Sequence, residues 1–336
     1  MSSRPSPSQR LHRGCVMLIL LTFTLACTAC TSPSRPQNGD SASVDATART
    51  VVHSRGTTTV ASVPERIVAL SSSWADTVIA FGRTPVGVGS IAGISSTGGH
   101  FPWQGDYAST SVTLTLLGAP AYEQIAALAP DLILADYSAR DAAVYNALSA
   151  IAPTIAPLAS TGYVDPWRTQ VSILGQIFNE TDRAERLITD TDNAIADVAR
   201  RHPNLAGRTF LIATARPGTI GLIASDTDPA ASLFVELGMH MDSEIVAQPN
   251  EATRTNIAVE NALPMMGADL LLIQGQAALL KASIPGWGNL PAVRSGAVAP
   301  IDGPLSAALS DPSVLAIAYL LRALEPQLRQ VGSAAL

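Results

Sequence analysis

The feature that most constrains the fold is an alternation of short apolar segments with helical segments, which runs through the chain twice. The first half predicts strands at 66–70, 86–89, 131–135 and 154–156, and helices at 74–81, 122–129 and 139–150. The second half predicts strands at 209–213, 269–273 and 297–301, and helices at 229–237 and 312–324. Apolar strands that alternate with helices are typical of a parallel sheet covered on both faces. The pattern therefore predicts an α/β protein with two Rossmann-like lobes dominated by parallel strands.

A long helical segment, 181–202, separates the two halves. Ala184, Ile188 and Ile195 lie at helical spacing within it. About twenty residues at about 1.5 Å each give a helix about 30 Å long. A helix of this length can brace two lobes.

The two halves also share a short pattern. Glu123 begins a helical segment and is followed by Asp131, which opens an apolar strand. Glu260 and Asp269 repeat this arrangement in the second half, with a spacing that differs by one residue. The repeat indicates two related lobes that face each other.

The N-terminus has the features of an export signal. Basic residues precede an apolar run at 16–26, which is too short to span a bilayer as a helix of about twenty residues. The run ends at Cys27 and Cys30, and bacterial lipoproteins are cleaved before such a cysteine, which is then acylated. Either cysteine could be the acylated one, and a plain secreted protein with incidental cysteines is the alternative. The following segment, 31–62, is rich in small polar residues and is predicted to be a disordered tether.

Composition excludes several functions. A net charge of −6 lacks the basic footprint of a nucleic-acid-binding protein. All three cysteines precede the folded part, and the five histidines are scattered, so no metal site of the chain's own is predicted. The serines at 71–73 lack the Gly-x-Ser-x-Gly pattern of a nucleophile, and no phosphate-binding glycine loop follows a strand. We therefore do not expect an enzyme.

Segments spread from about Pro64 to Leu328 carry a family resemblance. They are the opening strand, helix and strand at 64–70 and 76–88, the Glu–helix–Pro-Asp–strand segment at 123–134, the segment at 151–154, and the Trp-Gly-Asn-Leu-Pro-Ala-Val segment that begins 287–298. In this order the segments resemble the class III substrate-binding proteins, which serve iron-siderophore and vitamin B12 importers. The resemblance implies a ligand cleft between the two lobes, little opening or closing, and no cofactor beyond the iron that the ligand carries.

The resemblance also implies partners and a location. The partners are an ABC permease with its ATPase, a ferric siderophore, and the membrane through the N-terminal lipid anchor. The expected protein is monomeric, lies on the extracytoplasmic face of the cell membrane, and binds no nucleic acid. Vitamin B12 or haem as ligand, or a surface binding module that does not transport, are the alternatives. In relatives, an exposed glutamate at the tip of each lobe meets arginines of the permease. The resemblance implies this docking role for Glu123 and Glu260. The alternative is that both are carboxylates at helix starts, where the helix dipole favours a negative charge.

Ligand-binding residues are expected in loops at the carboxyl ends of the strands. Arginine supplies charge and forked hydrogen bonds, and tryptophan and tyrosine supply stacking surfaces, which suits a bulky, often anionic ferric chelate. The candidates of these types are Arg216, Trp74, Trp103, Tyr137, Arg140 and Trp287. The alternative for each is an aromatic packed on its own lobe or an arginine paired with an acid.

The predicted domain boundaries follow from these segments. They are a signal peptide at 1–30, a tether at 31–62, an N-terminal lobe at 63–160, linker helices at 161–205 and a C-terminal lobe at 206–336.

Overall fold

The computed structural model describes residues 48–90, 100–105, 111–115, 120–159, 164–248, 253–275, 278, 281–282 and 284–332. All of them belong to one compact unit. Cys27, Cys30 and the segment 31–47 lie outside the described residues. No helix in the described ranges is long and apolar enough to cross a membrane.

The N-terminal lobe is built on a five-stranded parallel sheet. Its strands, in spatial order, are β5 (Val112–Thr115), β4 (Gly87–Ser90), β3 (Ile67–Ala69), β6 (Leu132–Leu134) and β7 (Thr154–Ile155). Every residue of β3 and β6 is buried, because helices cover both faces. Ile67 belongs to the core that includes residues of α1 (Ser72–Ala80), and the next residue, Val68, belongs to the core under α2 (Tyr122–Ala127) and α3 (Ala142–Ser149).

The C-terminal lobe repeats the strand order with one difference. Its strands, in spatial order, are β10 (Arg254–Ala258), β9 (Thr219–Ile223), β8 (Phe210–Arg216), β11 (Leu270–Gly275) and β12 (Val298–Ile301). β8, β11 and β12 are parallel, whereas β9 runs antiparallel to both β8 and β10. The turn between β8 and β9 uses Gly218 at a φ of 73°, a conformation that glycine adopts without strain.

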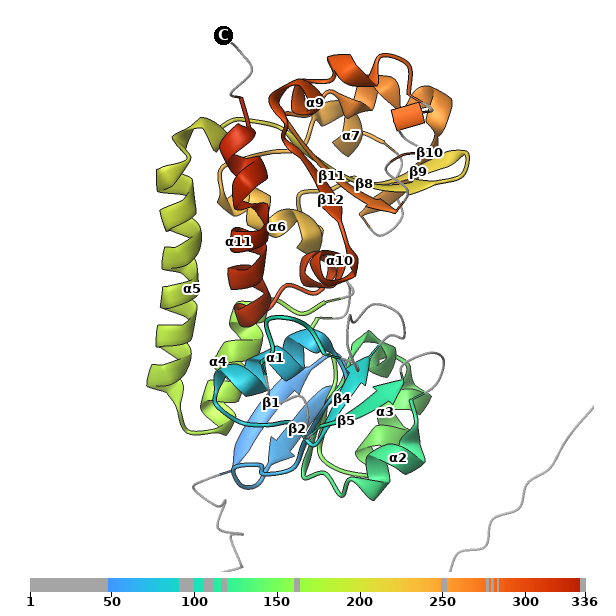
Figure 1. Ribbon diagram of the computed structural model, residues 1–336. Helices are drawn as coiled ribbons and strands as arrows, with labels where there is room; N and C mark the ends of the chain where they lie inside the picture. The colour runs from blue at the N-terminus through green and yellow to red at the C-terminus, as the bar shows by residue number, and fades with distance from the viewer. Residues whose placement is uncertain are drawn as a thin grey trace, which may run out of the picture. The chain divides into compact units, whose positions relative to one another are not determined.

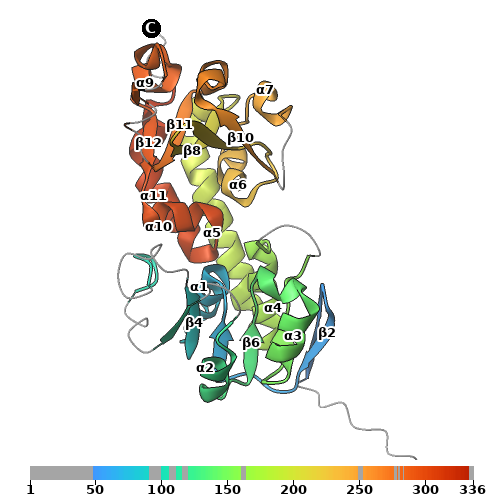
Figure 2. The ribbon, with the colours of Figure 1, turned by 90° about the vertical axis from the view of Figure 1, so that its right-hand side faces the viewer.

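Helices connect and cover the two sheets. The long ones are α4 (Trp167–Ile177), α5 (Thr181–Arg201) and α11 (Val314–Gln330), and α6 (Pro229–Glu236) and α10 (Gly303–Ser310) lie in the C-terminal lobe. α5 packs against α4 and α11 and extends alongside both sheets (Figures 1 and 2). It fills the range predicted for the bracing helix, so the fold is the predicted pair of α/β lobes joined by a long helix. The shorter helices are η2 (Tyr137–Arg140), η3 (Pro203–Leu205), α7 (Ser243–Val246), η4 (Val259–Asn261), η5 (Leu263–Met266), η6 (Trp287–Asn289) and α9 (Pro291–Ser295).

A hairpin occupies part of the predicted tether. β1 (Arg49–His53) pairs with β2 (Gly56–Val60), and Val51 and Val60 are buried in the core. Thr58 Oγ1 donates a hydrogen bond of 2.7 Å to the Thr154 carbonyl in β7. The prediction of a disordered tether is therefore wrong for 49–60. The buried residues of this hairpin are Val51, His53, Thr58 and Val60, and because two of them are polar the segment looks polar as a whole although one face is buried.

Two carboxylates join the lobes at what we call the lobe junction, formed by Asp76, Asp311, Ser72, Ser73 and Ser313. Asp311, between α10 and α11, accepts hydrogen bonds from Ser72 Oγ (2.6 Å) and Ser73 N (2.8 Å) at the start of α1. Asp76 of α1 accepts one from Ser313 Oγ, the residue that caps α11. Each lobe thus supplies a carboxylate that accepts hydrogen bonds at the start of a helix in the other lobe: Asp311 at the start of α1, and Asp76 at the start of α11.

Candidate functional site

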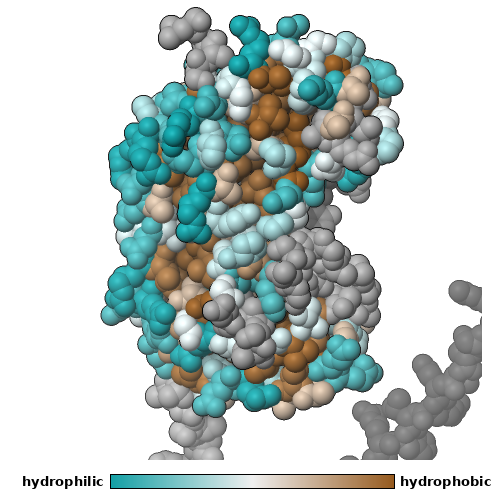
Figure 3. Space-filling model, in the orientation of Figure 1, coloured by the Kyte–Doolittle hydropathy of each residue, from teal (hydrophilic) through white to brown (hydrophobic). Residues whose placement is uncertain are grey.

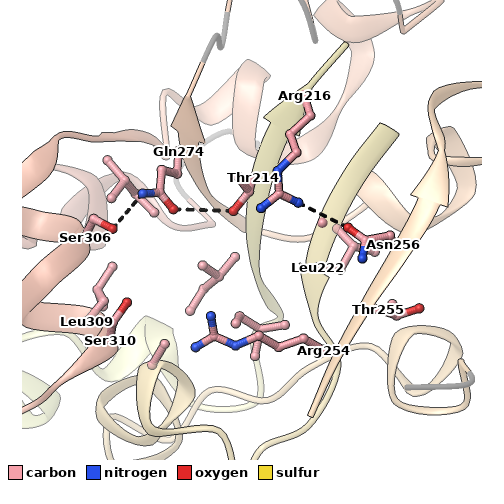
Figure 4. A pocket seen from close by; sticks show the side chains of 15 residues that line it. Thr214, Arg216, Leu222, Arg254, Thr255, Asn256, Gln274, Ser306, Leu309 and Ser310 are labelled. Atoms are coloured by element: carbon pink, nitrogen blue, oxygen red, sulfur yellow. Dashed lines mark hydrogen bonds between the residues drawn. The ribbon is translucent and has the colours of Figure 1, made fainter. Parts of the chain in front are cut away.

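A polar pocket of about 160 Å³ lies in the C-terminal lobe, between its sheet and α10 (Figure 4). Strands β8, β9, β10 and β11 supply most of its wall, and Ser306, Leu309 and Ser310 of α10 close one side. Because Gln274 and Arg216 stand at the ends of β11 and β8, the pocket lies at the carboxyl ends of parallel strands, where ligands meet open α/β sheets.

The floor of the pocket is a row of cross-strand neighbours. Thr214 of β8 pairs with Gln274 of β11 on one side and with Gly221 of β9 on the other, and Gly221 pairs with Asn256 of β10. Paired residues of a sheet point to the same face, so these side chains line one surface. Thr214 Oγ1 and Gln274 Oε1 are 3.4 Å apart, and Gln274 Nε2 donates a 2.7 Å hydrogen bond to Ser306 Oγ of α10. The helix and the sheet therefore hold this polar row together.

Arg216 lies across the sheet at one end of the row. Its Nη1 donates a hydrogen bond of 3.2 Å to Asn256 Oδ1 (Figure 4). A Cβ atom at Gly221 would come within 3.0 Å of this Nη1, so the absence of a side chain there makes room for the guanidinium. Arg216 forms no ion pair among the described residues. The predicted ligand residue thus presents its charge to the pocket.

Arg254 enters the pocket from β10, and a buried carboxylate positions it. Its Nε lies 3.1 Å from Asp228 Oδ2, and its side chain is 48% exposed whereas that of Asp228 is 1% exposed. Asp228 also caps α6 by accepting a 2.9 Å hydrogen bond from Ala230 N, and it accepts a 2.5 Å hydrogen bond from Thr253 Oγ1. Four donors surround this carboxylate and fix its position. Two of them are Nε and Nη2 of Arg254, so Asp228 holds that edge of the guanidinium and leaves Nη1 outside the ion pair.

The pocket adjoins the lobe junction. Ser310 lines the pocket, and the next residue, Asp311, accepts the hydrogen bonds from Ser72 and Ser73. On the side of the molecule opposite α5, the surface is hollowed between the two lobes (Figure 3). A ligand held by the pocket would therefore lie next to the contact between the lobes.

Burial changes the acidity of the junction carboxylates. It raises the pKa of Asp76 to about 7, against the opposing effect of hydrogen bonds from Ser313, Gln104 and Trp103. Burial also raises the pKa of Asp311, although Ser72 and Ser73 donate hydrogen bonds to it. Both groups are thus easier to protonate than ordinary aspartates.

Trp74 is not a ligand residue, which corrects the sequence prediction. Its side chain is 1% exposed and belongs to the main hydrophobic core. Its position directly after a strand suggested a loop, but Ser71 caps α1 and Trp74 already lies in the first turn of that helix. A buried indole offers no face to a ligand.

Trp103 is half-buried at the lobe junction. Its Nε1 donates a 2.7 Å hydrogen bond to Asp76 Oδ2, and its ring stacks on Phe101 and contacts Tyr319 of α11. These contacts engage the indole within the protein, so the structure gives Trp103 a role in joining the lobes and leaves its contact with ligand a prediction.

The remaining candidates are dispersed. Tyr137 is 51% exposed and, with Arg140, forms η2 after β6 of the N-terminal lobe; Arg140 Nε donates to the Ala159 carbonyl at 3.2 Å. Trp287 packs against the main core and does not line the pocket. The ligand roles of Tyr137, Arg140 and Trp287 stay predictions.

The two glutamates proposed for docking are both exposed. Glu123 lies in the first turn of α2, and Glu260 lies in η4. The aspartate that follows each one opens the expected strand, so the sequence repeat corresponds to equivalent places in the two lobes.

Sequence reasoning missed Arg254 and Asn256. Both lie on β10, whose five residues include no buried one, so no apolar run identified the strand. A signal was nevertheless present, because arginine and asparagine at positions i and i+2 of a strand share one face.

No cluster of three or more His, Cys, Asp or Glu side chains that could hold a metal ion occurs in the part of the chain that the structure describes. That the protein uses no metal or cofactor of its own stays a prediction.

Known proteins resemble this chain over most of its length. It is 25% identical to the probable siderophore-binding lipoprotein YfiY of Bacillus subtilis (strain 168) over 305 residues, which cover 85% of this chain and 90% of the relative. It is 27% identical to the Fe(3+)-citrate-binding protein YfmC of the same organism over 290 residues, which cover 84% and 87%. The solved structure of a periplasmic solute binding protein from Mycobacterium smegmatis str. MC2 155 matches with a TM-score of 0.70 and 26% identity, and covers 84% of this chain and 98% of that chain.

The family assignment follows from a match to the whole central part of the chain. The sequence profile described as "periplasmic binding protein" matches residues 67–305, which is well over half of the chain. The relatives are substrate-binding proteins and not enzymes, which agrees with the expectation from the sequence. The chain therefore belongs to the periplasmic binding protein family, and within it resembles the siderophore-binding proteins of ABC importers.

Proposed function

We propose that this protein is an extracytoplasmic solute-binding lipoprotein that binds a ferric siderophore between its lobes and delivers it to the permease of an ABC importer. The observation that carries the proposal is the pocket formed by Arg216, Arg254 and the polar row, which lies at the carboxyl ends of β8 and β11 beside the lobe junction. The names of the relatives support the same cargo, since one is a probable siderophore-binding lipoprotein and another an Fe(3+)-citrate-binding protein.

Delivery requires a docking surface for the permease, and its ATPase would act on the other side of the membrane. Glu123 and Glu260 are exposed acidic residues, one on each lobe. Two separated anionic points orient a docking protein and accelerate encounter with a basic partner. We assign both glutamates to permease docking, with the protein acting as a monomer.

Anchoring follows from the N-terminal sequence. Acylation of Cys27 or Cys30 would hold the protein on the extracytoplasmic face of the cell membrane. Replacing each cysteine with serine in turn identifies the acylated one, because the protein then leaves the membrane fraction only when that cysteine is lost.

The proposal is tested by uptake of radioactive iron in cells of the source organism that lack the gene. We expect uptake of at least one ferric siderophore to fall when the gene is deleted and to return with the wild-type gene. The double variant Glu123→Gln/Glu260→Gln should bind the chelate as tightly as the wild type and yet restore little uptake. Unchanged uptake of every ferric siderophore, haem and cobalamin in the deletion strain would reject a role in transport and favour a surface binding module.

A further inference from the structure

The pocket is too small for a complete ferric siderophore. Pockets that enclose a whole ligand of drug size have volumes of roughly 300–1,000 Å³, whereas this one has about 160 Å³. It can therefore receive only one arm of a bulky chelate. The iron centre of such a chelate would then lie outside this pocket.

The pocket carries net positive charge although the protein as a whole is acidic. Arg216 and Arg254 line it, and none of the lining residues within the described part of the chain is acidic. Asp228, which pairs with Arg254, is buried behind it, so the two arginines and this carboxylate together leave one net positive charge. The chain as a whole has a net charge of −6, so the positive charge at the pocket comes from the placement of its two arginines and not from a basic composition.

The pocket also offers hydrogen-bond donors in preference to acceptors. Asn256 Oδ1 already accepts from Arg216, and Gln274 Oε1 lies within hydrogen-bonding distance of Thr214 Oγ1. Arg254 Nη1 and Asn256 Nδ2 donate to no acceptor among the described residues. An ionised carboxylate is a pure acceptor that guanidinium groups bind with two parallel hydrogen bonds. The donors and the charge thus match a carboxylate.

We infer that this pocket binds a carboxylate arm of an anionic ferric chelate, so that the protein selects carboxylate-type chelates over neutral hydroxamate ones. The inference rests on the proposed function, which requires only that some ferric siderophore binds. It assigns Arg216, Arg254 and Asn256 to recognition of the carboxylate, and Asp228 to positioning of Arg254.

Calorimetric titration of the full chain in detergent tests the inference, with ferric citrate as the carboxylate probe and ferrichrome as the neutral hydroxamate probe. We expect the wild type to bind ferric citrate more tightly than ferrichrome. Arg254→Gln and Arg216→Gln should each weaken ferric citrate binding about tenfold or more, since each removes a charged hydrogen-bond donor. Asn256→Asp, which keeps the size of the side chain and adds a negative charge, should weaken it at least as much.

Controls separate recognition from folding. Arg200→Gln removes an exposed arginine on α5 that does not line the pocket, and should leave ferric citrate binding unchanged. Thermal melting of each variant verifies that it folds, and Arg254→Lys, which keeps the charge but loses the fork, should bind with intermediate affinity.

The outcomes distinguish the inference from the proposed function. Tighter binding of ferrichrome than of ferric citrate, with both arginine variants within twofold of the wild type, overturns the inference and leaves the siderophore-binding function in place. Binding of neither probe by a folded wild-type chain, nor of a ferric catecholate complex added as a third ligand, overturns both.

Discussion

Two aspartates do the same structural work in the two lobes. Asp131, just before β6, accepts hydrogen bonds from the backbone N–H groups of Glu65 (2.7 Å) and Arg66 (2.9 Å), which lead into β3. Asp269, just before β11, accepts one of 3.0 Å from Thr209 N, which leads into β8. The repeated aspartate in the sequence thus fixes the start of the central parallel strand pair in each lobe.

Removing this carboxylate should destabilise the C-terminal lobe. Asp269→Ala leaves Thr209 N without its side-chain acceptor and breaks the ion pair with Arg208, so we expect a loss of about 1–2 kcal/mol in the free energy of unfolding. Urea denaturation followed by circular dichroism measures it. Asp226→Ala, at an exposed loop position, is the control and should change the free energy by less than about 0.5 kcal/mol.

Asp76 should make stability depend on pH. Its pKa of about 7 in the folded protein exceeds the ordinary value of 3.8, so the folded state holds a proton that the unfolded state releases. The contribution of Asp76 to stability is therefore fully present below about pH 4 and is lost as the pH rises to about 7. Between pH 5 and pH 8 we expect the wild type to lose on the order of 2 kcal/mol relative to Asp76→Asn, which cannot titrate. Parallel curves for the two proteins across this range would show that Asp76 is ionised in the folded state throughout.

At the scale of elements, Arg168 ties three helices together. Lying on α4 and stacked over Trp167, it forms ion pairs with Asp192 of α5 and with Glu236 of α6, the latter at 2.7 Å. Hydrogen bonds and charge from Glu236 and Asp192 raise the pKa of Arg168. Because α6 belongs to the C-terminal lobe and α4 packs on α1 of the N-terminal one, this single side chain reinforces the brace that α5 provides.

The triple contact of Arg168 predicts a measurable loss on substitution. Its side chain is partly exposed, so water replaces some of the lost interactions, and Arg168→Gln should lower the free energy of unfolding by about 1 kcal/mol. Arg186→Gln, at an exposed position of α5, serves as the matched control. Equal stabilities of the two variants would mean that the three charges contribute nothing beyond an ordinary surface arginine.

Strands and helices could be predicted from the sequence where burial imposes a pattern of apolar residues. The fully buried strands β3 and β6, and β11 with its four buried residues 270–273, appear in the sequence as apolar runs, and α5 appears through its helical spacing. No such run occurs in β10, which has no buried residue, or in the hairpin of β1 and β2, where two of the four buried residues, His53 and Thr58, are polar. These three strands therefore escaped prediction, and with β10 two residues of the candidate site escaped as well.

At the scale of the whole molecule, the lobe junction governs how the two halves hold together. Asp311→Ala removes the acceptor of Ser72 Oγ and Ser73 N, so we expect a loss of about 2 kcal/mol and a wider distribution of lobe arrangements in small-angle X-ray scattering. Asp141→Ala removes a carboxylate that likewise accepts two hydrogen bonds, but within the N-terminal lobe at the start of α3. It should lower stability without changing the scattering curve, and the same scattering for both variants would contradict a joining role for Asp311.

Only part of the candidate site could be predicted from the sequence. Arg216 is predictable because it closely follows a predicted strand, and the structure places it at the end of β8 and in the lining of the pocket. Residue type makes Trp74 and Trp103 candidates for ligand binding, but Trp74 is buried in the core and Trp103 donates a hydrogen bond to Asp76. Which aromatic side chain faces solvent depends on contacts between segments far apart in the chain, such as 100–105 with α11, and no local pattern encodes those contacts.

The adjacency of Ser310 and Asp311 has an evolutionary consequence. Ser310 lines the polar pocket, and its neighbour Asp311 accepts hydrogen bonds from the opposite lobe, so substitutions at this end of α10 that change the pocket would also disturb the contact between the lobes. Residues of β9 and β10 line the pocket but do not belong to the lobe junction. Proteins that evolve from this one to bind new ligands should therefore change first in β9 and β10, while Ser310 and Asp311 at the end of α10 change slowly.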